Sequence, residues 1–270
     1  DMEGSRGLGD VYKRQGHLVE VVTDEGIMGW GECFGPGNVA IANKVIVERV
    51  IQPMILGENP LNRDVLWHKV YNLLRDHGQK GMPIQALSGV DIALWDILGK
   101  VTGLSISRLI GGRFREQVPV YGYGMMLRRE KLPALMDRFE DEAAAIKSSG
   151  FVATKMKVGL GPKQDVQLAE SVRRGVSGDF PFMVDANHCY TVDQALYVGR
   201  ALEELDAYWF EEPVAPEDLD GYQELRSQLT INIAGGEAEF TRWGWRNLLE
   251  KHCLDIAQPE VCALGGISEY

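Results

Sequence analysis

A regular alternation of short apolar segments and amphipathic helical segments fills the sequence after Gln117 and constrains the fold more than any other feature. The apolar segments read VPVYGYG, ATKMKVG, FMVDAN, YWFEEP, INIAGGE and LDIAQPE, and helical patterns such as VDQALYVGRALEEL separate them. This strand–helix–strand order predicts right-handed βαβ units and a parallel sheet. Six such strands in succession favour a (β/α) barrel over an open sheet that is covered on both faces.

The sequence between residues 16 and 117 has a different pattern, which predicts a separate α+β unit. A strand–turn–strand comes first, and helix-period apolar stripes follow it. The stripes lie in residues 42–56, 62–78 and 84–100. Asp91 and Asp96 fall in the last stripe, and we interpret them as capping or helix-surface acids rather than as catalytic groups.

Carboxylates recur at one position of the later repeat, the end of each apolar segment. Asp185, Glu211, Glu237 and Glu260 end four successive segments, at intervals of 26, 26 and 23 residues. One βα unit of a barrel occupies roughly 25–30 residues, so these groups are expected at the C-terminal ends of successive strands, the rim that carries the chemistry. Each acid alone is better explained as a solvated loop residue. The common register of the set is what indicates a site.

Two lysines precede the carboxylates in the segment TKMKVG, which begins at Thr154. Side chains at i and i+2 of a strand share a face, so Lys155 and Lys157 are expected to point the same way. Either that face is solvated and the pair has no function, or negative groups lie opposite it. The carboxylates of the following strands favour the second explanation.

Three clustered carboxylates require a counterion, because like charges a few ångströms apart cannot all stay ionised. A hard divalent cation meets that need, and ligation by oxygen alone favours Mg²⁺. The strand ends carry no histidine or cysteine, which disfavours zinc. A nearby cation and a neighbouring ammonium lower the pKa of a lysine, which would make a neutral amine available as a base.

Composition excludes several other classes of protein. A formal net charge of −11 argues against a nucleic-acid partner or an anionic membrane surface. No apolar run approaches the roughly 20 residues that span a bilayer. Four cysteines without CxxC spacing are expected to be reduced thiols of a cytoplasmic protein.

Together, the Lys-x-Lys pair and the motifs VDAN, FEEP and GGE resemble the mandelate racemase branch of the enolase superfamily. GWGE and LSGVDIALWDILGK are similar to the capping domain of that family. The resemblance implies a partial α+β capping domain in residues 16–117 and the first six strands of a (β/α) TIM-type barrel in residues 118–270. Residues 1–15 show no hydrophobic period, and we interpret them as a non-native tail, with a disordered native tail as the alternative.

The resemblance also implies roles for the residues at the strand ends. Asp185, Glu211 and Glu237 would bind Mg²⁺. Lys157 would take a proton from the carbon α to a substrate carboxylate, and Lys155 would steady the resulting enolate. A lysine base with magnesium and an enolate-type intermediate is the known pattern of this superfamily.

Three further positions are expected near the substrate or its acid–base groups. Asn187 would lie beside the substrate, whereas His188 would either touch the substrate or pack beside the rim. Glu260 stands where the branch places an aspartate that orients a histidine on the seventh strand, and its extra methylene alters that geometry. The sixth segment carries no lysine, which distinguishes the chain from the muconate cycloisomerase branch.

Motifs such as ISRLIGGRFRE, DANHCYT and EEPVAPEDLD resemble the acid-sugar cycloisomerases and dehydratases of this branch. The implied function is removal of a proton α to the carboxylate of an acid sugar or its lactone, followed by cycloisomerisation or dehydration. The alternatives are a racemase of another 2-hydroxy acid and an inactive metal-binding or interaction protein. Against the family pattern the chain looks truncated at both ends, so we expect it to be inactive alone and homo-oligomeric at full length.

Overall fold

The computed structural model describes residues 16–35 and 37–270, which fall into two compact units. The barrel unit comprises residues 117–236 and 248–258. The capping unit comprises the described residues up to Glu116 together with Glu237–Asn247 and Pro259–Tyr270. The described residues form one six-stranded sheet and one two-stranded sheet, which confirms the predicted fold class.

The six-stranded sheet of the barrel unit is parallel, and its strands follow chain order from β3 to β8. The strands are β3 (Gly122–Tyr123), β4 (Thr154–Lys157), β5 (Phe182–Asp185), β6 (Trp209–Glu211), β7 (Asn232–Gly235) and β8 (Ile256–Ala257). Each of the six predicted apolar segments therefore contains one strand. Chain order without exchange of neighbours is the arrangement expected of a barrel wall.

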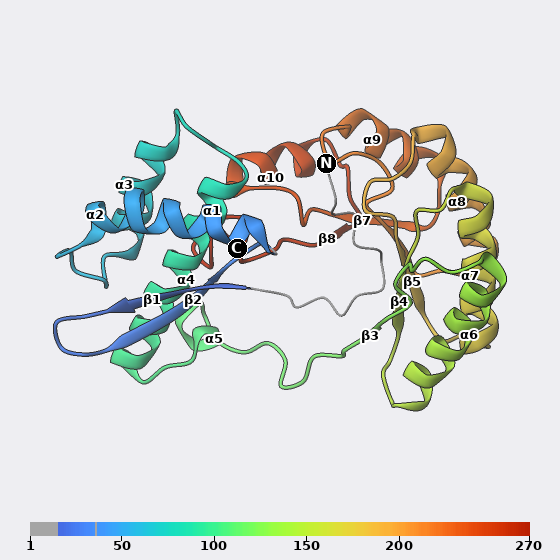
Figure 1. Ribbon diagram of the computed structural model, residues 1–270, viewed down its shortest axis with the longest axis horizontal. Helices are drawn as coiled ribbons and strands as arrows, with labels where there is room; N and C mark the ends of the chain where they lie inside the picture. The colour runs from blue at the N-terminus through green and yellow to red at the C-terminus, as the bar shows by residue number, and fades with distance from the viewer. Residues whose placement is uncertain (1–15, 36) are drawn as a thin grey trace, which may run out of the picture. The chain divides into compact units, whose positions relative to one another are not determined.

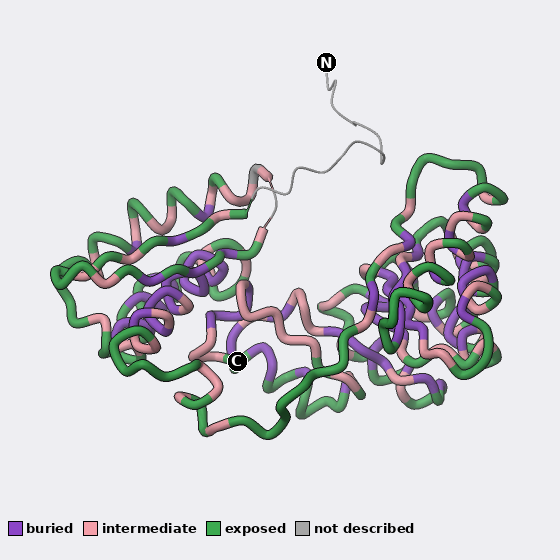
Figure 2. The backbone as a smooth tube through the Cα atoms, turned by 90° about the horizontal axis from the view of Figure 1, so that it is seen from below, coloured by how far each residue is buried: buried purple, intermediate pink, exposed green. Residues whose placement is uncertain are grey.

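Amphipathic helices connect these strands, and α6, α7 and α8 lie side by side along the sheet (Figure 1). The connecting helices are α6 (Leu132–Ser148), α7 (Pro162–Val176), α8 (Val192–Glu204), α9 (Leu219–Gln228) and α10 (Thr241–Glu250). Thr191 begins α8 with a capping box that also uses the Gln194 side chain. The buried residues follow the strands and the inner faces of the helices (Figure 2), and Phe139, Phe182 and Phe210 are fully buried among them.

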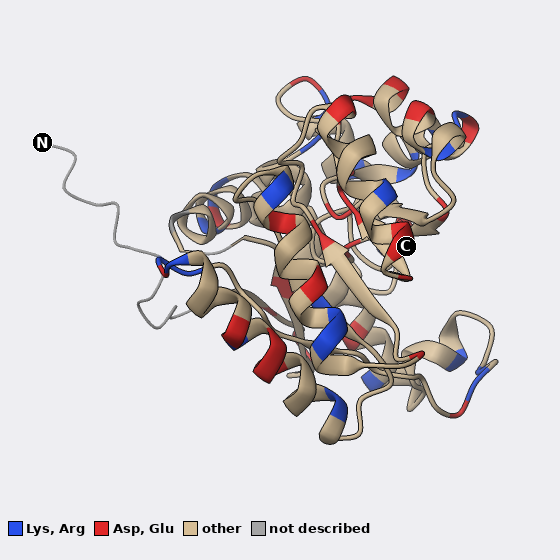
Figure 3. Cartoon of the chain, turned by 90° about the vertical axis from the view of Figure 1, so that its right-hand side faces the viewer, with Lys and Arg blue, Asp and Glu red and all other residues tan. Residues whose placement is uncertain are grey.

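The outward faces of these helices carry charges of both signs, interspersed rather than segregated (Figure 3). Arg138 pairs with Glu142 at 2.7 Å within α6, and Arg174 of α7 pairs with Glu140 of α6 at 2.9 Å. Exposed ion pairs of this kind contribute about 0–1 kcal/mol each. The stability of the barrel unit therefore rests on its apolar interior rather than on these surface pairs.

The capping unit combines the predicted hairpin with a helical layer. The hairpin is an antiparallel pair, β1 (His17–Val22) and β2 (Met28–Cys33). The helices are α1 (Asn38–Ile46), the π-helix η1 (Val47–Ile51), α2 (Gln52–Ile55), α3 (Arg63–Leu74), α4 (Met82–Thr102) and α5 (Ile106–Leu109). No helix within the described part of the chain is both long and apolar enough to cross a membrane.

One helix departs from its predicted form, because the stripe in residues 42–56 is not a single α-helix. It changes to π-helical bonding at Val47–Ile51 and returns to α-helix at Gln52. Pro53 lacks the amide hydrogen that would continue the α-helical bonding. The widened turn before it accommodates that loss.

Glycines allow β2 to lie directly against α4. A Cβ atom on Gly31 would clash with the carbonyl oxygen of Gly89, and a Cβ atom on Gly89 would clash with the Cys33 sulfur. The motif GWGE and the glycine of LSGVD therefore belong to one backbone contact. This contact fixes the hairpin on the longest helix of the capping unit.

Asp91 differs from its prediction as a capping or surface acid, because it is only 1% exposed. It lies on α4 and accepts hydrogen bonds from the hydroxyl and the amide of Ser268, at 2.6 and 3.0 Å. Burial raises the pKa of Asp91 to about 6, although the Ser268 hydrogen bonds and the charge of Arg63 oppose that shift. Asp96 is a surface acid as predicted, and it accepts a hydrogen bond from Lys100 at 2.7 Å.

The raised pKa of Asp91 predicts a specific pH dependence of stability. The folded state favours the protonated carboxyl group, so its stabilising effect is complete below about pH 4 and is lost as the pH rises through about 6. We expect the free energy of unfolding to fall by about 2 kcal/mol more between pH 4 and pH 7 than in Asp91→Asn, which stays neutral. Urea unfolding across this range measures the difference.

Asp96→Asn is the matched control for this experiment, because it removes a carboxylate from the same helix. Its pKa is lowered by the hydrogen bonds from Lys100 and Trp30 in spite of some burial, so its contribution to stability is greatest at neutral pH. Identical pH profiles for the parent and Asp91→Asn would contradict the prediction.

Candidate active site

One lysine and two carboxylates lie in a row across the ends of three neighbouring strands. Lys157 ends β4, Asp185 ends β5 and Glu211 ends β6. The strand register pairs Lys157 with Asp185 and Asp185 with Glu211. The row therefore lies at the C-terminal edge of the sheet, where the spacing of the sequence motifs placed it.

The lysine pair and the carboxylates are in direct contact. Lys155 donates to both oxygens of Glu211, at 2.7 and 2.9 Å, and its Nζ lies 3.2 Å from Asp185 Oδ2. Lys157 donates to Asp185 Oδ2 and to Asn187 Oδ1, each at 2.5 Å. The two ammonium groups thus point the same way and face negative groups, so the solvated-face explanation of the lysine pair is wrong.

Burial makes these charges depend on one another, since Lys155, Asp185 and Glu211 are 8%, 0% and 2% exposed. Burial would raise the pKa of Asp185, but the contacts with Lys157 and Lys155 hold it below its usual value. Burial and the charge of Asp185 raise the pKa of Glu211, which Lys155 only partly offsets. The ionised form of Glu211 is therefore disfavoured first by burial and second by the charge of Asp185.

The pKa of Lys155 is determined by the carboxylates that contact it. Burial acts to lower it, but the carboxylates of Glu211 and Asp185 outweigh burial and raise it above the ordinary value for a lysine. Both carboxylates lie close to its ammonium, Glu211 at 2.7 Å and Asp185 at 3.2 Å. Lys155 is suited to carry a permanent positive charge rather than to act as a base.

Aromatic and amide groups complete the surroundings of the row, and the sequence analysis did not identify them. The Lys155 ammonium lies 5.8 and 5.6 Å from the ring centres of Tyr121 and Tyr123, within range of a cation–π interaction. Trp209 Nε1 and Gln258 Nε2 each donate to Glu211 Oε2 at 3.0 Å. The strand alternation places Tyr121 and Tyr123 on one face and could have indicated them.

Asn187 and His188 occupy the turn after β5, both with the left-handed backbone that non-glycine residues rarely adopt (φ 40° and 55°). The amide of Asn187 donates to Asp185 Oδ1 at 3.0 Å, and the amide of His188 donates to the Glu212 carbonyl at 2.7 Å. Asn187 therefore belongs to the charged row through Lys157 and Asp185. The His188 residue is exposed, and its hydrogen bond to Glu212 is made by the backbone amide.

The remaining two predicted residues belong to the capping unit. Glu237 is partly exposed in a turn two residues beyond the end of β7. Glu260 accepts the amide of Cys262 at 3.0 Å and so caps the turn that follows β8. Among residues 16–35 and 37–270, no three carboxylates, imidazoles or thiols form a group that could hold a metal ion.

Two of the three predicted ligands nevertheless suit magnesium. Asp185 and Glu211 offer hard oxygen donors from adjacent strands, and the charge of Asp185 adds to burial in raising the pKa of Glu211, an effect that a divalent cation would oppose. The same oxygens now accept hydrogen bonds from Lys155. Asp185 and Glu211 therefore fit the ion, and Glu237 stays a predicted ligand.

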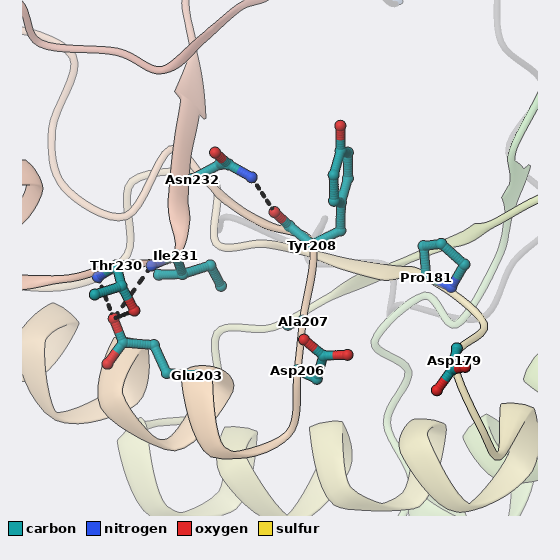
Figure 4. A pocket seen from close by; sticks show the side chains of 9 residues that line it. All are labelled: Asp179, Pro181, Glu203, Asp206, Ala207, Tyr208, Thr230, Ile231 and Asn232. Carbon is teal, nitrogen blue, oxygen red and sulfur yellow. Dashed lines mark hydrogen bonds between the residues drawn. The ribbon is translucent and has the colours of Figure 1, made fainter.

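A separate hollow of about 300 Å³ lies at the opposite ends of the strands (Figure 4). Several of its polar groups are used within the fold: Glu203 accepts the amide and hydroxyl of Thr230, and Asn232 donates to the Tyr208 carbonyl at 2.8 Å. In barrels, the N-terminal ends of the strands serve stability rather than chemistry. This hollow is therefore not the candidate site.

The fold is that of part of an enolase-type C-terminal domain, and sequence comparison agrees. Residues 138–270 match the family described as enolase C-terminal domain-like. Residues 7–111 match the mandelate racemase / muconate lactonizing enzyme, N-terminal domain. The chain belongs to the mandelate racemase/muconate lactonizing enzyme family of the enolase superfamily, which confirms the resemblance seen in its motifs.

Several characterised proteins are similar over most of the chain. It is 42% identical to D-galactarolactone cycloisomerase of Agrobacterium fabrum, covering 96% of this chain and 67% of that protein. It is 36% identical to arabinonate dehydratase of Saccharolobus solfataricus, covering 93% of this chain and 66% of that protein. A racemase from Streptomyces coelicolor with bound magnesium superposes with a TM-score of 0.86 at 32% identity, covering 93% and 69%. The chain thus spans about two thirds of the length of these relatives.

The buried contacts of Lys155 predict a large effect on stability. Lys155→Met leaves Glu211 without its main counter-charge, and breaking a buried ion pair from one side destabilises a protein by about 3–5 kcal/mol. Lys155→Met combined with Glu211→Gln should recover part of that loss, because the buried negative charge is also removed. Urea unfolding of the single and double variants measures both free energies.

Lys69→Met is the matched control, since Lys69 forms an exposed ion pair with Glu58 at 2.5 Å. An exposed pair of this kind is worth about 0–1 kcal/mol. If Lys155→Met were no more destabilising than Lys69→Met, the row would not be a buried and coupled charge cluster.

Proposed function

We propose that the site catalyses removal of the proton α to the carboxylate of an acid sugar or its lactone. The observation that carries this proposal is the pairing of two lysines on β4 with the carboxylates that end β5 and β6. A positive charge that is fixed and buried beside a second amine suits a reaction in which negative charge develops on a substrate carboxylate. The acid-sugar class is supported by the relatives, one named for D-galactarolactone and one for arabinonate.

Lys157 is the proposed base. It lies at the strand end and is the more exposed of the two lysines. In its neutral form, Nζ takes the α proton and becomes an ammonium, while the electron pair of the broken C–H bond moves into the substrate carboxylate to give an enediolate. Asn187 Oδ1 contacts Nζ at 2.5 Å and orients it for this transfer.

Lys155 is the proposed electrostatic stabiliser. Its ammonium is held by Glu211 and Asp185, so it is positioned before substrate arrives and needs no reorganisation when charge develops. Magnesium held by Asp185, Glu211 and Glu237 would supply a second positive charge for the carboxylate oxygens. The relative from Streptomyces coelicolor, whose structure contains magnesium, supports that assignment.

The enediolate has more than one outcome. Loss of a β-hydroxyl gives dehydration, and closure or opening of a ring gives cycloisomerisation. The names of the cycloisomerase and the dehydratase support these two outcomes, whereas the name of the Streptomyces coelicolor relative supports racemisation. Glu260 and His188 are the proposed residues for later proton transfer and substrate contact, respectively.

Replacement of the proposed base tests this function. In deuterated water, the protein at the full length of its relatives should exchange the α proton of galactarate or D-galactarolactone, and NMR spectroscopy follows that exchange. Lys157→Met should lower the rate by at least about 10²-fold, the lower end of what a positioned base contributes. Lys163→Met, an exposed lysine of α7, is the matched control and should exchange at the parent rate.

Two results would contradict the proposal. Exchange by Lys157→Met at the parent rate would mean that another group is the base. No exchange by the folded full-length protein would favour the alternative of a metal-binding or interaction protein without turnover.

Magnesium binding is tested separately by calorimetry. Glu211→Gln removes a proposed ligand charge, so Mg²⁺ affinity should fall by about tenfold or more, as even outer-sphere partners cause losses of about 10–100-fold. Glu217→Gln, an exposed carboxylate of the following loop, is the control and should bind as the parent does. Equal affinities for Glu211→Gln and the parent would exclude Glu211 as a ligand.

A further inference from the structure

Asp165 is a buried carboxylate that the proposed reaction does not use directly. It lies in the first turn of α7 and is 1% exposed. Its oxygens accept three consecutive amides of the loop after β4, those of Gly159 at 3.0 Å, Leu160 at 3.0 Å and Gly161 at 2.9 Å. That loop begins directly after Lys157, so Asp165 fixes the backbone beside the proposed base.

Its fourth hydrogen bond leaves this loop. The hydroxyl of Tyr190 donates to Asp165 Oδ2 at 2.6 Å, and Tyr190 belongs to the loop after β5. The amide of Tyr190 also donates to the Pro213 carbonyl, at 3.3 Å, in the loop after β6. The first three bonds are enough to cap the helix. The bond from Tyr190 does something else, because it connects the loop after β4 with the loop after β5.

The connection matters because the loop after β5 carries Asn187 in a left-handed conformation. A residue keeps such a conformation only where its surroundings hold it. Tyr190 anchors the loop three residues after Asn187, and its ring packs near Phe210, with ring centres 6.1 Å apart. Asn187 in turn contacts the Nζ of Lys157.

We propose that Asp165 and Tyr190 form a positioning pair that holds Asn187 and Lys157 in the relative position that proton transfer requires. This inference rests on the function proposed above. Neither residue touches the reacting atoms. The pair acts by fixing two loops against each other through one buried hydroxyl–carboxylate bond.

Tyr190→Phe tests the pair, because it deletes only the hydroxyl and leaves the ring in place. Tyr222→Phe is the matched control: Tyr222 is also buried in the same unit, and its hydroxyl donates to the Val214 carbonyl at 3.3 Å. Three quantities are measured on the full chain. They are the melting temperature, the kcat and KM of α-proton exchange on galactarate, and the deuterium exchange of backbone amides in residues 158–161 and 186–190.

Tyr190→Phe should lower kcat by about 100-fold, the effect of a displacement of about 1 Å at a reacting group. Its KM and its melting temperature should match those of Tyr222→Phe, because only the alignment of Lys157 changes. Amide exchange should accelerate in both loops. A purely structural hydroxyl would change the melting temperature and would leave kcat at the value of the control.

Two results would overturn the inference. They are equal kcat values for Tyr190→Phe and Tyr222→Phe, including a fall that both share, and unchanged amide exchange in the two loops. If the full-length protein does not exchange the α proton, the proposed function fails, and the positioning role fails with it. Amide exchange then still decides whether the hydroxyl–carboxylate bond joins the loops.

Discussion

The ammonium of Lys155, buried between the carboxylates of Glu211 and Asp185, is the interaction on which the site depends. Neither carboxylate could remain charged at such burial without a cation in contact. The contact exists only if β4, β5 and β6 keep a single register, because a one-residue slip would turn each side chain to the other face. The pairing of β4, β5 and β6 and the charge contacts of the site therefore depend on each other.

Much of the barrel unit could be predicted because local sequence patterns specify its strands and helices. Apolar segments of strand length, separated by helical periodicity, identify βαβ units without knowledge of any distant contact. The charged ends of β5 and β6 were predictable for the same reason, since an equal interval along the chain becomes an equivalent position in space. The facing lysines followed from the two-residue period of a strand.

The features that the sequence did not reveal depend on contacts across long stretches of chain. Asp91 looked like a surface acid because its partner, Ser268, lies 177 residues away. The raised pKa of Lys155 required knowledge that Glu211 approaches to 2.7 Å. Gln258 beside Glu211 and Tyr190 beside Asp165 are likewise defined by tertiary packing rather than by any local pattern.

The register of β4, β5 and β6 also sets how this kind of site can diversify. Neighbouring strands are separated by about 4.8 Å, so the backbone positions that carry Lys157, Asp185 and Glu211 form a grid whose spacing does not depend on the loops. Exchange of one side chain for a longer or shorter one moves a charge by less than that spacing. New chemistry can therefore evolve by residue exchange at fixed grid points, while loop replacement changes which molecules reach them.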